Sequence, residues 1–232
     1  MNDTAPQPPA GGENPFLKSV HMMATLGGVA LAAGVLMVTV YESTAPRIAA
    51  NRAERLRQAI FEVLPGAEDR VAFAPANDGI ERVPEEDEQD APYFAGYDDD
   101  GNLIGVAVRG SAQGYQDMIR ALFGYDPVEE RIIRFNVLEN QETPGLGDRI
   151  AWDSDFLESI EGLDVSLESS EDTLRNPVTH VQEGAPREDW QIDGISGATI
   201  SVEAVVAVIN RSMEQHARRL KNSLDTLEEA AP

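Results

Sequence analysis

An uncharged stretch near the N-terminus constrains this chain more than any other feature of its sequence. No residue from Ser19 to Tyr41 carries a formal charge when His21 is neutral, and the centre, Leu26 to Val40, is Leu, Val, Ala, Gly and Met apart from Thr39. A helix needs about 20 apolar residues to cross the hydrocarbon core of a bilayer. The stretch has neither a strongly basic start nor an A-x-A cleavage signature, which favours a retained anchor. We therefore predict a transmembrane helix over 18–41, with a buried core helix as the weaker alternative.

The segments on either side of this span bear on its topology. Residues 1–17 are rich in Pro and Gly and are expected to be a disordered lead. Lys18 alone precedes the span, whereas four arginines follow it: Arg47, Arg52, Arg55 and Arg57. The positive-inside tendency taken alone would place the rest of the chain in the cytoplasm, although long domains translocate regardless of flanking charge.

The composition excludes several classes of chemistry. The chain has 41 Asp and Glu against 18 Lys and Arg, a formal net charge of −23, three His and no Cys. Without thiols there are no disulfides, no Cys-ligated zinc or iron–sulfur clusters and no cysteine nucleophile. The scattered histidines predict no metal site, and so acidic a surface predicts no nucleic-acid partner. Carboxylate chemistry, hydroxyl chemistry or a bound organic cofactor remains.

Hydropathy patterns predict an α+β fold after the anchor. Apolar residues recur at helical spacing after Pro46 and stop at Pro65-Gly66, so residues 42–92 are expected to form a membrane-proximal helix and an acidic loop. Residues 93–224 are expected to form one domain with a central sheet flanked by helices, and residues 225–232 a flexible tail. The predicted elements of the domain at 93–224 are strands at 93–97, 103–109 and 131–138, a short helix capped by Asp153, and a closing helix at 201–224.

A glycine-bearing motif lies directly before the closing helix: Asp193-Gly194-Ile195-Ser196-Gly197-Ala198-Thr199. Small residues allow a loop to approach a ligand closely, and a helix N-terminus offers unpaired N–H groups and the positive end of its dipole. This is an arrangement suited to phosphate, with Ser196, Thr199 and Ser201 as hydroxyl donors. The alternative is a loop in which Thr199 or Ser201 merely caps the helix.

A second motif, Glu142-Thr143-Pro144-Gly145-Leu146-Gly147, follows the strand predicted at 131–138. A rigid turn that holds a carboxylate, a hydroxyl and accessible backbone N–H groups could border a planar heterocycle. An ordinary surface turn is the alternative, because a lone Pro/Gly turn is weak evidence.

Together the motifs resemble the FMN-binding domain shared by the G subunit of the Rnf/Rsx electron-transport complexes (RnfG/RsxG) and the C subunit of the sodium-pumping NADH:quinone reductase (NqrC). The motif ending at Thr199 matches the family's flavinylation signature. The resemblance covers the anchor, the helix that ends at Leu64-Pro65-Gly66 and most of residues 93–215, and looks more like RnfG. The family's other block is matched by Gly114-Tyr115, Gly124-Tyr125-Asp126-Pro127 and Glu142–Gly147.

The resemblance implies a covalent cofactor. FMN would be joined by a phosphoester to Thr199 Oγ, installed by a flavin transferase, with the attachment loop formed by Asp193, Gly194, Ser196, Gly197 and Ala198. The isoalloxazine ring would be expected near Glu142, Thr143, Leu146 and Gly147, with Tyr115 as a further candidate.

The resemblance also implies a function and a location. The chain would be a membrane-anchored electron-transfer subunit of an Rnf-type ferredoxin:NAD oxidoreductase complex coupled to ion translocation, with other membrane subunits as partners and no catalytic site of its own. It would lie in a bacterial inner membrane with a cytoplasmic N-terminus and the FMN domain on the periplasmic face, against the arginine count. Two other classes remain: a membrane-tethered sensory FMN module without redox turnover, and a structural subunit with an empty loop at Thr199.

Overall fold

The first described element is a single long helix. The computed structural model describes residues 15–76, 79–168 and 173–231, in two compact units that divide between Arg52 and Ala53. Helix α1 (Pro15–Val63) runs through this boundary and contains Pro46. The disordered lead expected over 1–17 falls outside the described residues up to residue 14, and residues 15–17 begin α1.

Pro46 lies inside this helix without interrupting it. A proline removes one N–H donor from the helical ladder, yet the turns on both sides stay helical. Just before it, the hydroxyls of Ser43 and Thr44 donate to the Val40 carbonyl at 2.9 and 2.8 Å. One window of this helix is long and apolar enough to cross a membrane, and none of that window is buried inside the structure.

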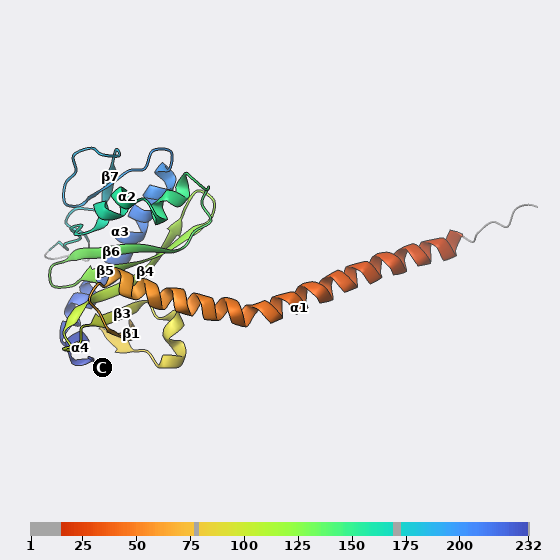
Figure 1. The fold of residues 1–232 in the computed structure, drawn as a ribbon, viewed down its shortest axis with the longest axis horizontal. Helices are drawn as coiled ribbons and strands as arrows, with labels where there is room; N and C mark the ends of the chain where they lie inside the picture. Colours follow the sequence, from red (N-terminus) through yellow and green to blue (C-terminus); the bar gives the residue numbers. More distant parts are fainter. Residues whose placement is uncertain (1–14, 77–78, 169–172, 232) are drawn as a thin grey trace, which may run out of the picture. The chain divides into compact units, whose positions relative to one another are not determined.

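A six-stranded antiparallel sheet forms the centre of the second unit (Figure 1), in the order β2-β1-β3-β4-β5-β6. Its strands are β1 (Asp69–Pro75), β2 (Ile80–Arg82), β3 (Tyr93–Tyr97), β4 (Leu103–Gln113), β5 (Met118–Asp126) and β6 (Arg131–Glu139). The strands expected at 93–97, 103–109 and 131–138 are present as β3, β4 and β6. The first keeps its predicted bounds, and the other two run further.

Helices cover both faces of this sheet (Figure 1). Because side chains alternate along a strand, Tyr93, Ala95 and Tyr97 of β3 join a core with α3 (Thr199–Asn222). Phe94 points to the other face, against the end of α1 at Ile60 and Val63. The expected α+β fold with a sheet flanked by helices is thus confirmed.

The compact unit extends beyond the boundaries expected for the domain. It includes β1 and β2, which pair with the sheet before residue 93, and a short 3-10 helix, η1 (Glu85–Asp90), in the segment expected to be an acidic loop. The flexible tail expected from residue 225 is instead helix α4 (Leu224–Glu229). Leu227 of α4 is buried, and its carbonyl accepts a hydrogen bond of 2.6 Å from the Tyr97 hydroxyl.

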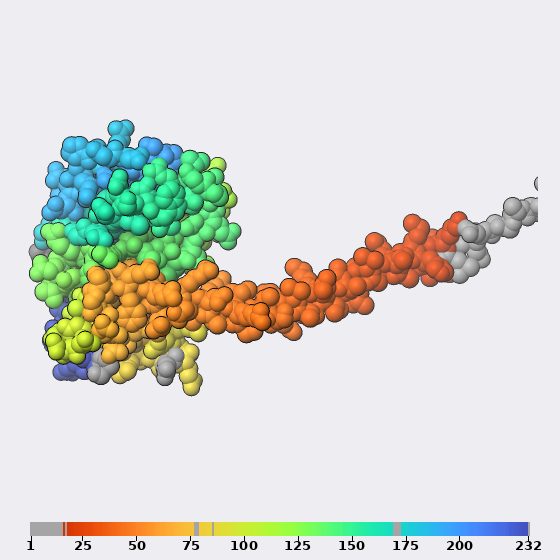
Figure 2. Space-filling view, in the orientation of Figure 1, coloured from red at the N-terminus to blue at the C-terminus, as the bar shows by residue number. Residues whose placement is uncertain are grey.

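Smaller elements gather at one end of the unit, where Figures 1 and 2 both show α2 (Ser154–Ile160) beside the segment that carries β7 (Thr179–Val181). Asp153 caps α2, as expected, by accepting from Phe156 N at 3.2 Å. β7 pairs in parallel with β8 (Gln191–Asp193). The loop that follows β8 leads directly into α3.

Candidate functional site

The loop between β8 and α3 brings Thr199 to the first position of a long helix. The loop lies tightly against β7, since a Cβ on Gly194 would stand 2.6 Å from the Val181 carbonyl oxygen. Gly197 has φ +83°, a conformation that side chains disfavour. The N-cap residue is Ala198, which provides no side-chain cap. The first N–H groups of α3 therefore lack a side-chain acceptor from the cap.

Neither hydroxyl proposed as a cap has that role. Thr199 is exposed, and within the described part of the chain its hydroxyl makes no hydrogen bond. The Ser201 hydroxyl instead donates to Glu142 at 2.5 Å. The capping alternative is therefore not what the structure shows at either residue.

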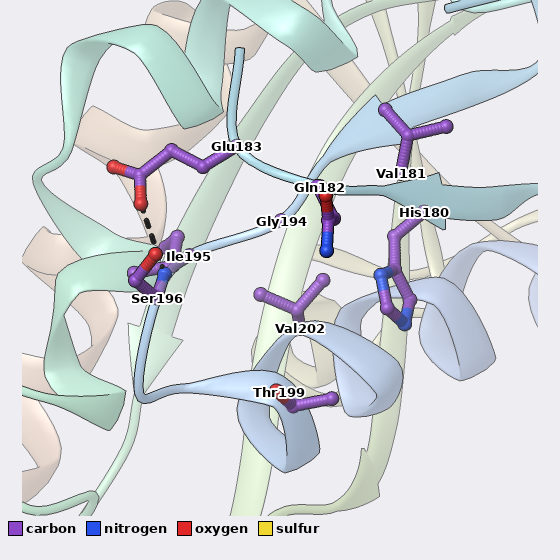
Figure 3. Close-up of a pocket in the computed structure, with 9 residues that line it drawn as sticks. All are labelled: His180, Val181, Gln182, Glu183, Gly194, Ile195, Ser196, Thr199 and Val202. Carbon is purple, nitrogen blue, oxygen red and sulfur yellow. Dashed lines mark hydrogen bonds between the residues drawn. The ribbon is translucent and has the colours of Figure 1, made fainter. Parts of the chain in front are cut away.

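A pocket of about 570 Å³ opens beside Thr199 (Figure 3). Binding sites for small molecules and cofactors commonly measure about 300–1,000 Å³. Thr199 and Val202 of α3 form one side of it, and the segment from His180 to Glu183 faces them. The complete lining is His180, Val181, Gln182, Glu183, Gly194, Ile195, Ser196, Thr199 and Val202.

Glu183 joins the loop before Thr199 to the segment on the opposite side of this pocket. Its carboxylate accepts from Ser196 N at 3.1 Å (Figure 3) and from Arg149 Nη2 at 3.2 Å. Arg149 is itself held by Asp153, at 2.5 Å. Hydrogen bonds from the Ser196 hydroxyl and backbone, and then from Arg149, hold the pKa of Glu183 below its ordinary value. The loop before Thr199 is thereby tied to a carboxylate that favours its charged form.

The second motif meets the first through Glu142. Only 5% of Glu142 is exposed, and its carboxylate accepts from Ser201 in α3 and from Gln116 N, the latter at 3.2 Å. Leu146 lies against the loop before Thr199, since a Cβ on Gly197 would stand 3.2 Å from the Leu146 Cδ2 atom. The two motifs are far apart in the sequence and adjacent in space.

The other predicted site residues lie in different places. Thr143 accepts a hydrogen bond of 2.7 Å from Gln116 Nε2, and Tyr115 is 66% exposed. Asp193 does not line the pocket: one carboxylate oxygen is 3.9 Å from Arg187 Nε, and the other is buried without a hydrogen-bond partner. Sequence reasoning missed the pocket wall formed by His180, Gln182 and Glu183, which lies in a polar segment without periodicity.

Comparison with known proteins identifies the family and the fold. The FMN-binding domain family matches residues 114–214, and the family described as the RnfG N-terminal region matches residues 24–63. A crystal structure of Shewanella oneidensis NqrC has the same fold, with a TM-score of 0.60 at 19% identity over 76% of this chain and 99% of that chain. A crystal structure of the C subunit of the Na⁺-translocating NADH-quinone reductase from Parabacteroides distasonis is similar, with a TM-score of 0.58 at 18% identity over 75% of this chain and 96% of that chain. The fold and the family match thus define an FMN-binding domain that follows one candidate membrane helix among the described residues.

Similar full-length proteins show which family of FMN-binding proteins this chain belongs to. The G subunit of the ion-translocating oxidoreductase complex from Methanosarcina acetivorans is 30% identical over 83% of this chain and 92% of its own length. Its counterpart from Cereibacter sphaeroides (strain ATCC 17029) is 30% identical over 91% of each chain. The chain belongs to the family of G subunits of ion-translocating oxidoreductase complexes.

Proposed function

We propose that this chain is a membrane-anchored electron-transfer subunit that carries FMN bonded to Thr199 and relays single electrons within an Rnf-type ferredoxin:NAD oxidoreductase complex coupled to ion translocation. The observation that carries the proposal is the Thr199 hydroxyl, which is exposed, free of hydrogen bonds within the described part of the chain, and adjacent to a pocket.

The residues around Thr199 fit a phosphate ester. The start of α3 has no side-chain cap, so its N–H groups and the positive end of its dipole suit an anion. Gly194 and Gly197 allow the loop before Thr199 to pack closely against Val181 and Leu146. Ser196, in the same loop, lines the pocket with Thr199. These features support attachment at Thr199 rather than at the buried Ser201.

The protein holds and orients the cofactor, while the flavin supplies the redox chemistry. We assign the ring-side contacts to the exposed residues of the second motif and its neighbour, Leu146 and Tyr115, with Thr143 beside them. No residue of this chain is assigned as an acid, base or nucleophile in electron transfer, and the chain acts as a subunit of a larger enzyme.

Attachment requires a second protein, a flavin transferase. With a flavin dinucleotide as donor the step balances: a bond forms between Thr199 Oγ1 and the phosphorus of the FMN half. The pyrophosphate bond to the nucleotide half breaks, and the hydroxyl proton and the nucleotide monophosphate leave. The exposed position of Thr199 supports access by such an enzyme.

We propose that the membrane span is residues 18–41 of α1 and that it lies in a bacterial inner membrane. We propose that the FMN domain lies on the periplasmic side, in line with the resemblance to RnfG.

The test is flavin fluorescence of the denatured chain on a gel, after co-expression with a flavin transferase. We expect Thr199→Ala to abolish the fluorescent band, because it deletes only the attachment oxygen, and Thr199→Ser to retain it. Thr226→Ala is the matched control, since it removes an exposed threonine hydroxyl from α4. Its band should equal that of the unaltered chain.

The outcomes separate the alternatives. Covalent flavin that persists in Thr199→Ala would contradict attachment at that residue. A folded chain that carries no flavin after co-expression would favour the structural subunit. Flavin attached to a chain that purifies without partner subunits and shows no redox turnover would favour the sensory module.

A further inference from the structure

One buried carboxylate joins three segments next to the attachment site. Glu142 Oε2 accepts from the Ser201 hydroxyl at 2.5 Å, and Oε1 accepts from Gln116 N at 3.2 Å. Glu142 itself begins the loop that runs to Gly147. The turn at 114–117, this loop and the first turn of α3 are therefore fixed to one another through a single side chain.

The Glu142 carboxylate packs closely against two glycines. A Cβ on Gly114 would stand 2.5 Å from Oε1, and a Cβ on Gly147 would stand 2.7 Å from Oε2. Carbon atoms do not approach oxygen so closely, so both positions must stay free of side chains. With 5% of its surface exposed, Glu142 acts on its neighbours rather than on a bound molecule.

Three residues with exposed apolar side chains are next in sequence to residues that lie against the Glu142 carboxylate. Tyr115 lies between Gly114 and Gln116, Leu146 precedes Gly147, and Ile200 precedes Ser201; their exposed fractions are 66%, 47% and 48%. Each of these side chains therefore belongs to a residue one Cα step, about 3.8 Å, from a residue that contacts or packs against the carboxylate. We call Tyr115, Leu146 and Ile200 the apolar platform.

We propose that Glu142 is a positioning residue: by fixing the three members of the apolar platform, it holds the flavin attached at Thr199 in one orientation. The inference rests on the proposed function, and it replaces the expectation that Glu142 touches the ring. Thr199 immediately precedes Ile200, so a flavin tethered there starts at the edge of the platform.

The competing position for the ring is the pocket beside Thr199, lined by residues that include His180 and Gln182. In α3, Thr199 and Val202 face that pocket, whereas Ser201 faces Glu142. The platform is the better support, because its side chains are large, apolar and exposed, as a planar aromatic ring requires.

The experiment uses the full-length chain in detergent, after co-expression with a flavin transferase. Covalent flavin is measured by gel fluorescence, ring orientation by visible circular dichroism and by fluorescence anisotropy of the flavin, and folding by the melting temperature. In Glu142→Ala we expect covalent flavin to remain but most of the induced circular dichroism to be lost and the anisotropy to fall. Glu142→Gln should restore both signals, since its amide can accept from Gln116 N and donate to the Ser201 hydroxyl.

Matched variants separate positioning from charge and from folding. Glu203→Ala removes an exposed acid from the same end of α3 and should leave the flavin signals unchanged. If Glu142→Ala does not fold, Leu146→Ala and Ile200→Ala test the platform directly, and each should reduce the circular dichroism. Three results would each overturn the inference. The first is unchanged circular dichroism and anisotropy in Glu142→Ala, and the second is an equal loss of these signals in Glu142→Gln. The third is a loss of these signals in His180→Ala but not in Leu146→Ala. Absence of covalent flavin from the unaltered chain would instead overturn the proposed function.

Discussion

At the residue scale, two hydroxyl residues at the start of α3 differ in exposure and in hydrogen bonding, although they are close in sequence. Thr199 and Ser201 are two residues apart, which places their side chains about 200° apart around the helix. Thr199 faces the pocket with its hydroxyl free of hydrogen bonds in the described structure, while Ser201 is buried and bonded to Glu142. Only the first is available for modification.

A histidine at the other end of α3 gives the domain a dependence on pH. The Tyr93 hydroxyl and His216 Nδ1 are 2.7 Å apart, and burial, followed by the nearby Arg219 charge, lowers the pKa of His216 from its ordinary value of 6.5. The folded domain therefore binds this proton less readily than the unfolded chain does. His216 leaves stability intact above pH 6.5 and reduces it as the pH falls below that value.

We expect the melting temperature to fall as the pH is lowered from about 7 to about 5, a window above the ordinary titration of carboxylates. His216→Gln should flatten this fall, because it removes the group that titrates. Thr226→Ala, which removes an exposed side chain that does not titrate, serves as the comparison and should keep the slope of the unaltered chain. A slope that is the same in His216→Gln as in the unaltered chain would contradict the assignment.

At the scale of elements, α4 is part of the domain rather than a tail. Leu227 is fully buried, and its carbonyl accepts from Tyr97 on β3. Leu227→Ala should lower the free energy of unfolding by about 2–5 kcal/mol, the usual cost of emptying a buried leucine site. Chemical denaturation followed by circular dichroism measures this, and Thr226→Ala on the exposed side should change it by less than about 0.5 kcal/mol. Equal stabilities of the two variants would show that α4 does not contribute to the core.

Local patterns predicted local elements well. The alternation that predicts β3 and the Asp153 cap of α2 are both signals contained within a few residues, and both are present in the structure. β5 was missed because Gly124-Tyr125-Asp126-Pro127 has the composition of a turn. In the structure Gly124 lies inside the strand, where a Cβ would stand 2.2 Å from the Val63 carbonyl oxygen. The glycine is needed for close packing against α1, which no pattern within β5 reveals.

The same holds for the site: its local motifs could be predicted from the sequence, and its long-range contacts could not. The attachment loop and the loop after β6 are contiguous motifs, so the sequence indicates both. The contact between Glu142 and Ser201 joins residues 59 apart, and the pocket wall at His180 to Glu183 comes from a segment whose polar composition predicts only a loop. Both features depend on how β7, β8 and α3 pack together.

At the scale of the whole molecule, the proposed topology has a direct test. Alkaline phosphatase is active only after export, so a fusion after Tyr41 in a bacterial host should be active if the domain faces the periplasm. A fluorescent protein that matures only in the cytoplasm, joined at the same residue, should stay dark. An inactive phosphatase together with a domain shielded from external protease would place the domain on the other side, as the arginines after the span suggest.

Because α3 packs on a sheet formed by earlier strands, the core of the domain can be completed only late in synthesis. The sheet face that carries Tyr93 and Tyr97 is covered by α3, and Tyr97 finds its partner 130 residues further along the chain. At about 5–20 residues per second, the roughly 100 residues from the end of β4 to the end of α3 take about 5–20 s to make. During that time the N-terminal helix is already made, but the apolar sheet face that carries Tyr93 and Tyr97 is not yet covered by α3. A ribosome that stalls before Thr199 would leave that face of the sheet exposed to solvent.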